Sequence, residues 1–282
     1  MNALPDLRPS PIAGQWYNAD PRELAAEMNR YLALAKPPSL EGEVVSLIVP
    51  HAGHVYSGPV AAWAFKTVQG NAYDLVVIVA PMHRPYPQPL LTSSHSGYAT
   101  PLGAIPLDAE AITDLDQQLQ ASLGVPLSRI ARDTEHSLEI ELPFLQCALS
   151  AEFKLLPVMV RDQDAETMQA LADGLARVLK GKRALLVASS DLSHFYSARV
   201  AERLDAEILR EIEAFSPEGL FAADRAGKGY ACGLGPIAAV LWASRALGAT
   251  SARVVQYATS GDITRDYTSV VGYGAAVTTR PA

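Results

Sequence analysis

Four short runs of apolar residues constrain the fold of this chain more than any other feature. They are VVSLIV at residues 44–49, DLVVIVA at 74–80, FKLLPVMV at 153–160 and ALLVASS at 184–190. Continuous apolar runs of this length, without polar alternation, are typical of strands buried on both faces, as in parallel sheets. Segments with helical periodicity separate the runs. Strands alternating with helices predict an α/β fold whose central sheet is covered by helices on both faces.

Helical periodicity and capping residues predict the intervening helices. Asp20, Pro21 and Glu23 provide an N-cap, a first-turn proline and a capping-box glutamate for the first helix. The predicted helices cover residues 20–35, 59–68, 108–122, 137–149 with a kink at Pro143, 164–180, 197–215 and 235–247. Short strands around turns are predicted within 90–108, and two closing strands at 252–259 and 269–279. No break in composition marks a boundary, so we predict a single domain, 1–282, with a mixed central sheet.

The charge balance bears on the classes of partner. The chain has 23 Lys and Arg against 30 Asp and Glu, a net charge of −7, and no basic run interleaved with aromatics. We therefore expect neither nucleic acid nor a membrane surface as a partner. Residues 229–244 are uncharged, but this stretch is too short and too broken by Gly and Pro to span a bilayer. With two cysteines and no secretory segment, the chain is predicted to be a reduced, cytoplasmic protein.

Histidines follow three of the predicted strands directly. His51 and His54 follow the first, His83 and Arg84 the second, and Asp191 and His194 the fourth. In α/β sheets, ligands bind in the loops beyond the carboxyl ends of the strands. Strand-end loops are polar in any case, and a histidine there can simply be solvated. Because the strands are buried and their ends converge, we favour a binding site.

Each of these residues can be interpreted structurally as well as functionally. His51 and His54 lack the i, i+4 spacing of a helical zinc-binding pair, so the pair is a weak motif alone. Asp191 could orient the imidazole of His194, or could cap a helix. His83 lies between two prolines, in a loop that could hold a ligand rigidly or form a plain turn.

Three further residues remain open at this point. Glu135 and His136, in TEHSLE, begin a predicted helix, and capping is as good an interpretation as a pocket role. Cys232, in GYACGLGP, precedes a helix, where the helix start favours a thiolate, and we favour a ligand role over a buried structural one. Cys147 lies on the apolar face of its helix and is predicted to be core. The chain lacks GxGxxG, Walker A and G-x-S-x-G motifs.

Taken together, these segments resemble a known family. The motifs AGQWYNAD, VPHAGHVYSG, APMHR, DTEHSLEIELPFL, LLPVMV, VASSDLSHF and ACGLGPI occur in the order and spacing of the Memo family. Its prokaryotic members are called AmmeMemoRadiSam system protein B. The resemblance covers nearly the whole chain. It implies a fold similar to the class III extradiol ring-cleavage dioxygenases, which are non-haem iron enzymes.

The resemblance also implies roles for individual residues. The metal ligands would be His51, His83 and Cys232, with His194 as acid/base and Asp191 in the same pocket. Glu135 and His136 belong to a family motif, and we expect both to line the pocket. Arg84 and His54 are also expected there, although His54 has no family role to inherit. A set with one thiolate suits Fe(II), with Cu or Zn as alternatives.

Two functions follow from this resemblance. The first is a non-haem-iron oxidoreductase that acts on a small aromatic or catechol-like substrate, with Asp191 orienting His194. The alternative is a non-catalytic module with a vestigial dioxygenase site that binds a metal, or a protein or peptide; the ligand expected in either case is a small molecule or a peptide. The family name also implies a radical-SAM enzyme and an AMMECR-type protein as partners.

Overall fold

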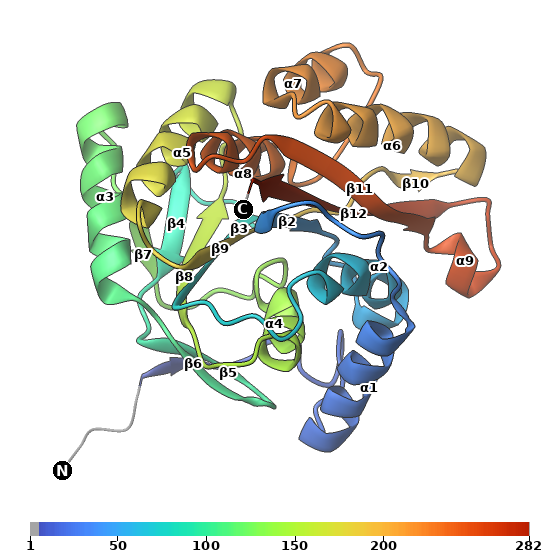
Figure 1. Ribbon diagram of the computed structural model, residues 1–282, viewed down its shortest axis with the longest axis horizontal. Helices are drawn as coiled ribbons and strands as arrows, with labels where there is room; N and C mark the ends of the chain where they lie inside the picture. The colour runs from blue at the N-terminus through green and yellow to red at the C-terminus, as the bar shows by residue number, and fades with distance from the viewer. Residues whose placement is uncertain (1–5, 282) are drawn as a thin grey trace.

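One mixed sheet organises the molecule. In the computed structural model, which describes residues 6–281, nine strands follow the order β10-β12-β2-β9-β3-β8-β4-β7, with β11 paired to β12 (Figure 1). The strands are β2 (Glu43–Val49), β3 (Leu75–Pro81), β4 (Leu90–Ser93), β7 (Ser128–Ile130), β8 (Lys154–Val160), β9 (Ala184–Ser189), β10 (His194–Tyr196), β11 (Ser251–Thr259) and β12 (Val270–Arg280). A separate small sheet contains β1 (Leu7–Arg8), β5 (Gly97–Thr100) and β6 (Gly103–Pro106).

The centre of the large sheet is parallel, and an antiparallel strand borders it on either side, while the last pair, β4 and β7, is again parallel. β2 pairs with β9, β9 with β3, and β3 with β8, all in parallel. β12 runs antiparallel to β2, and β4 antiparallel to β8. The predicted mixed sheet is therefore confirmed. Because β2, β9 and β3 are adjacent and parallel, the loops that follow them leave the sheet at the same edge.

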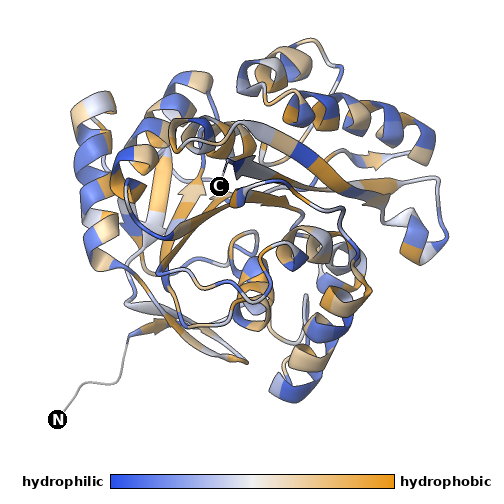
Figure 2. Cartoon of the chain, viewed as in Figure 1, coloured by the Kyte–Doolittle hydropathy of each residue, from blue (hydrophilic) through white to orange (hydrophobic). Residues whose placement is uncertain are grey.

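Helices cover both faces of this sheet (Figure 1). One face carries α1 (Pro21–Leu34), α2 (His54–Lys66) and α4 (Leu142–Ala148), and the other α3 (Ala109–Leu123), α5 (Ala165–Leu179), α6 (Ala198–Glu213), α7 (Pro217–Arg225) and α8 (Leu234–Ala246). The short helix α9 (Gly261–Thr264) follows β11. Apolar residues fill the strands, while the outer helices alternate apolar and polar faces (Figure 2). The architecture is the predicted one: an α/β sheet flanked on both sides.

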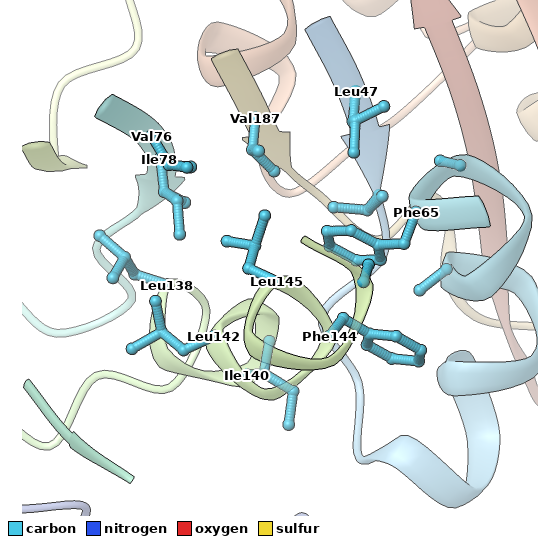
Figure 3. Packing of buried hydrophobic residues seen from close by; sticks show 14 of the residues in the cluster. Leu47, Phe65, Val76, Ile78, Leu138, Ile140, Leu142, Phe144, Leu145 and Val187 are labelled. Carbon is cyan, nitrogen blue, oxygen red and sulfur yellow. The ribbon is translucent and has the colours of Figure 1, made fainter. Parts of the chain in front are cut away.

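The core beneath α2 and α4 contains a pair of stacked aromatic rings. The rings of Phe65 and Phe144 are 4.9 Å apart between centroids and inclined by 5°. Leu47 on β2 and Val187 on β9 project into the same cluster (Figure 3). Cys147 is half-buried against it, in line with its predicted core role. Packing of α2 and α4 thus fixes the start of α2 relative to the sheet.

The predicted start of α2 is wrong by five residues. The helix begins at His54, so Pro59 lies inside it rather than opening it. Proline at the first turn is the common arrangement, and it led us to that start. Here the first turn forms without it, because the backbone N–H groups of Tyr56 and Ser57 both donate to the carbonyl oxygen of Gly53.

Two further helix predictions need correction. Residues 137–149 do not form one kinked helix: a 3-10 turn, η1 (Glu139–Glu141), precedes α4, and Pro143 lies in the first turn of α4. A proline there breaks no helical hydrogen bond, so it starts the helix instead of kinking it. The helix α7 was not predicted, although Ser216 and Pro217 supply its N-cap and first-turn proline. Among the described residues, none of the helices combines the length and apolarity that crossing a bilayer requires.

Candidate metal centre

Three imidazoles meet at the carboxyl edge of the parallel strands. His51 follows β2, His83 follows β3, and His136 lies in the loop before η1. One ring nitrogen from each lies within 4.8 Å of the other two. The ring centroids are 5.3 Å apart for His51 and His83, and 4.8 Å apart for His83 and His136. Metal–imidazole bonds are about 2.1 Å long, so small side-chain movements bring all three nitrogens onto one ion.

Two of these rings are oriented by oxygen atoms. Nδ1 of His83 lies 2.9 Å from Oε1 of Glu135, and the backbone N–H of His83 donates to Oε2 of the same carboxylate at 2.7 Å. Nδ1 of His51 lies 2.9 Å from Oγ of Ser189, whose hydroxyl donates to the carbonyl oxygen of Ser137. Since that hydroxyl proton is already used, His51 donates from Nδ1 and keeps a lone pair on Nε2. Oxygen partners of this kind fix the tautomer of metal-binding histidines.

Burial keeps the imidazoles of His51 and His136 neutral. Burial lowers the pKa of His51 well below its usual value, and positive charge on His136 and His83 would lower it further. Burial also lowers the pKa of His136 to about 4, against the opposing effect of Glu135. For Glu135, burial acts to raise the pKa, but the hydrogen bond and charge of His83 outweigh it and the net shift is downward. Neutral imidazole is the form that binds a metal ion.

Cys232 lies directly beside the three histidines. Its Sγ is 3.2 Å from Nε2 of His51 and 3.5 Å from the carbonyl oxygen of Asp191. Burial and the charge of Asp191 raise the pKa of the thiol and outweigh the lowering effect of the Gly233 N–H at the start of α8, so the predicted preference for a thiolate is not found. The structure therefore offers His136 as a donor that we had not placed among the ligands, with the predicted ligand Cys232 next to it.

Asp191 holds the backbone at His51 instead of orienting His194. Its Oδ1 accepts hydrogen bonds from the N–H groups of His51, at 2.8 Å, and Ala52, at 3.2 Å. Burial raises the pKa of Asp191 to about 7. Nε2 of His194 is buried and has no hydrogen-bond partner among the described residues. Burial, then the charge of His83, lowers the pKa of His194. The expected Asp191–His194 pair is thus replaced by an aspartate that fixes the ligand loop and a separate, free imidazole.

The two other expected pocket residues lie outside the cluster. His54 is buried in the core, where its ring stacks on Tyr17 and meets the edge of Phe144, and its Nε2 bonds to the carbonyl oxygen of Ile140 at 2.8 Å. The pocket role expected for His54 is therefore wrong, because α2 starts at this residue and turns its side chain under the helix. Arg84 is exposed beside His83.

His54 makes stability sensitive to acid. Burial lowers its pKa to about 4 from 6.5. Because the folded value is the lower one, the unfolded chain takes up the proton first, and stability is lost as the pH falls from 6.5 towards 4. At full protonation this amounts to about 3 kcal/mol. We expect urea unfolding at pH 7, 5.5 and 4.5 to show a smaller loss for His54→Phe than for the wild type. Equal losses in both proteins would contradict this assignment.

Trp16 is a site residue that was not singled out from the sequence. Its ring lies 4.0 Å from that of His136, and the carbonyl oxygen of Trp16 accepts from the N–H of His54 at 2.9 Å. The only signal was its place in the AGQWYNAD motif. A cavity of about 420 Å³ lies on Trp16 and is lined also by Ala52, Tyr56, Val271 and Tyr273 among others; its lining among the described residues includes no charged side chain and none of the three histidines. A larger hollow of about 1240 Å³ lies at the opposite edge, where β2 and β9 begin.

Comparison with known proteins identifies the family. The family model described as "Memo-like protein" matches residues 8–277. A MEMO1 family protein of Nitrosopumilus maritimus is 32% identical over 273 residues, covering 95% of this chain and 98% of that protein. One from Methanosarcina mazei is 36% identical, covering 96% and 99%, and one from Methanocaldococcus jannaschii is 33% identical, covering 96% and 98%. With a match of this extent, from the strand that bears Arg8 to the last strand of the sheet, the chain belongs to the Memo family.

Proposed function

We propose that this protein is a metal-dependent oxidoreductase of the extradiol-dioxygenase type, acting on a small aromatic diol or a similar chelating substrate. One observation carries the proposal: a three-imidazole cluster and a buried imidazole nitrogen, Nε2 of His194, which has no hydrogen-bond partner within residues 6–281, share the carboxyl edge of the sheet. The first provides a metal site and the second a proton acceptor. Both atoms of O₂ end in the ring-opened product, so the reaction requires no external reductant.

The donor set fits a divalent first-row metal ion. His51 and His83 would hold it, with His136 and Cys232 as the donors that complete the set. We expect Fe(II), with Cu or Zn as alternatives, because imidazole and thiolate suit all three. When bound, the ion would supply the Lewis-acid and redox chemistry of ring oxidation.

The protein's own residues would bind the substrate and move its protons. His194 is neutral at pH 7, since burial lowers its pKa, so its unpaired Nε2 can accept a proton from a substrate hydroxyl. The uncharged cavity beside Trp16 and Tyr273 would take the apolar part of the substrate. Asp191 would keep the His51 loop in place through its two backbone hydrogen bonds.

Oxygen consumption tests this function. Protein reconstituted anaerobically with Fe(II) is mixed with air-saturated buffer and a panel of catechols, and O₂ uptake is followed with an electrode. We expect uptake with at least one catechol, and a loss of about 100-fold or more in His194→Gln at unchanged iron content. Stoichiometric iron without uptake for any catechol would overturn the oxidoreductase and favour the binding function.

That second function has an observation of its own. Phe195 is 77% exposed beside His194, and its backbone lies in the left-handed region at φ 64°. Tyr196 and Tyr230 are also exposed nearby. Exposed aromatic side chains are enriched at protein interfaces. We therefore propose that a peptide or protein binds at this rim. The radical-SAM and AMMECR-type partners that the family name implies are candidates. Reduced retention of a candidate partner by Phe195→Ser would support it.

A further inference from the structure

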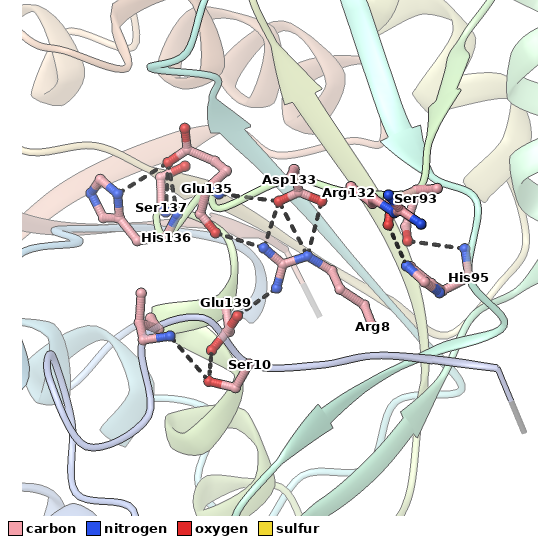
Figure 4. A network of polar contacts seen from close by, with 12 residues as sticks. Arg8, Ser10, Ser93, His95, Arg132, Asp133, Glu135, His136, Ser137 and Glu139 are labelled. Atoms are coloured by element: carbon pink, nitrogen blue, oxygen red, sulfur yellow. Dashed lines mark hydrogen bonds and ion pairs between the residues drawn. The ribbon is translucent and has the colours of Figure 1, made fainter.

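A buried arginine from the start of the chain lies behind the metal centre. Arg8 on β1 is 3% exposed, and its guanidinium faces the loop before η1 (Figure 4). Its Nε donates to Oδ2 of Asp133 at 3.0 Å, and one of its terminal nitrogens donates to Glu139. Both carboxylates are as buried as the arginine. The cluster thus joins two segments that are 125 or more residues apart in the chain.

The same guanidinium fixes the peptide groups on either side of Glu135. Its second terminal nitrogen donates to the carbonyl oxygen of Glu135 at 2.8 Å. Oδ1 of Asp133, which also binds Arg8, accepts the N–H of Glu135 at 3.1 Å. Glu135 is the residue whose carboxylate holds both the ring and the backbone of His83. Three successive contacts therefore lead from Arg8 to a metal-binding imidazole.

The segment that follows Arg8 makes a second connection to the centre. The hydroxyl of Tyr17 donates to Oε1 of Glu139 at 2.7 Å, and Ser10 bonds to the same oxygen. Between them in sequence, the ring of Trp16 packs against that of His136, with centroids 4.0 Å apart and planes inclined by 34°. Residues 7–17, which we call the N-terminal strap, therefore contact the loop that carries Glu135 and His136 at several points.

A structural ion pair alone would not require this arrangement. Arginine has five donors in a planar fork, and here they reach two carboxylates and one carbonyl of a single segment, residues 133–139. A lysine could keep the charge but has one ammonium group, which cannot span the same three acceptors. The contacts of Arg8 therefore position the backbone of Glu135 as well as neutralise the two carboxylates.

We propose that Arg8 is a positioning residue of the metal centre: it holds the carbonyl group of Glu135 directly and the N–H of Glu135 through Asp133, and so sets the carboxylate that orients His83. The inference rests on the proposed metal site but not on the proposed oxidation. Loss of an outer partner of a metal ligand weakens metal binding about 10- to 100-fold. The N-terminal strap is then part of the site, although it supplies no ligand.

The test measures metal affinity in the full chain. Arg8→Lys and Arg8→Met are compared with the wild type by competition for Zn(II) against a chromophoric chelator, and by the visible spectrum of the Co(II) form. We expect the Zn(II) dissociation constant to rise about tenfold in Arg8→Lys and further in Arg8→Met, with a changed Co(II) spectrum. Arg183→Lys, in an exposed pair with Asp74, is the matched substitution and should leave affinity unchanged.

A second control separates affinity from stability. Leu175→Ala opens a cavity on α5, in the core on the opposite face of the sheet, and should lower the melting temperature without changing Zn(II) affinity. An unchanged dissociation constant in both Arg8 variants, or an equal loss in Leu175→Ala, would overturn the positioning role. If Arg8→Met does not fold, Arg8→Lys decides alone. Absence of Zn(II) binding by the wild type would overturn the metal site and this inference together. If the Arg8 variants bind Zn(II) more weakly but the wild type takes up no O₂ with any catechol, only the proposed oxidoreductase activity is overturned.

Discussion

Protein with His83→Ala is expected to lose stoichiometric metal, with an affinity more than about 100-fold below that of the wild type. The reason is geometric: Glu135 holds the ring of His83 through Nδ1, so this imidazole is already oriented for an ion before the ion arrives. Elemental analysis of freshly purified protein and a chelator competition measure the effect. His95→Ala is the control, because His95 bonds to Asp6 and to the carbonyl oxygen of Ala131, away from the cluster. Unchanged metal content in His83→Ala would show that the ion lies elsewhere.

The visible spectrum of the Co(II) form, together with metal affinity, distinguishes the third ligand. The family resemblance implied Cys232, whereas the cluster of ring nitrogens contains His136. A sulfur-to-Co(II) charge-transfer band that disappears in Cys232→Ser would assign the thiol, which lies 3.2 Å from Nε2 of His51. A Co(II) form without this band, together with weakened binding in His136→Ala, would assign an all-imidazole set. Both variants losing affinity would assign four donors.

Truncation of Phe144 to alanine is expected to destabilise the protein by about 3–5 kcal/mol. The ring is 1% exposed, stacks on Phe65 and touches His54, so its removal leaves a cavity at the junction of α2 and α4. Neighbouring rings are part of a close-packed core and cannot collapse into the space without moving α2. Urea unfolding followed by circular dichroism gives the change in free energy.

The matched variant for this position is Phe144→Leu. Leucine retains most of the apolar volume, so we expect it to cost less than half as much as alanine. A loss below about 1 kcal/mol for Phe144→Ala would mean that the site relaxes freely, against the packing described for this core.

The sequence was most informative where one rule governs the geometry. The apolar runs that became β2, β3, β8 and β9 were recognisable because a strand covered on both faces must be apolar throughout. Their order as parallel neighbours then placed His51 and His83 at a common edge. Strand-end position alone was sufficient to bring these two residues together. It failed for His54, because the direction of this side chain depends on where α2 begins. Helix starts depend on local hydrogen bonds, which the periodicity of a sequence does not reveal.

The orienting contacts could not be read from the chain. Glu135 belongs to a loop 52 residues from His83, and Arg8 is 127 residues from Glu135. Nothing in composition or spacing pairs an arginine of the first strand with that loop. Asp191 is a second example. It lies three residues from His194 in the sequence, but it accepts its hydrogen bond from the backbone of His51, 140 residues away. Side-chain partners at such separations follow from the packed sheet, not from neighbouring letters.

The dispersal of the donors along the chain has a kinetic consequence. His51 and Cys232 are 181 residues apart, and each imidazole of the cluster follows a different strand or loop. An unfolded chain therefore presents no chelate, and the closure of such long loops comes late in folding. A metal ion that binds only the finished sheet would slow unfolding and leave the rate of folding unchanged. In stopped-flow folding experiments, added Zn(II) should thus lower the unfolding rate constants and leave the folding rate constants unchanged. The ion would then stabilise the native state kinetically without guiding the chain towards it.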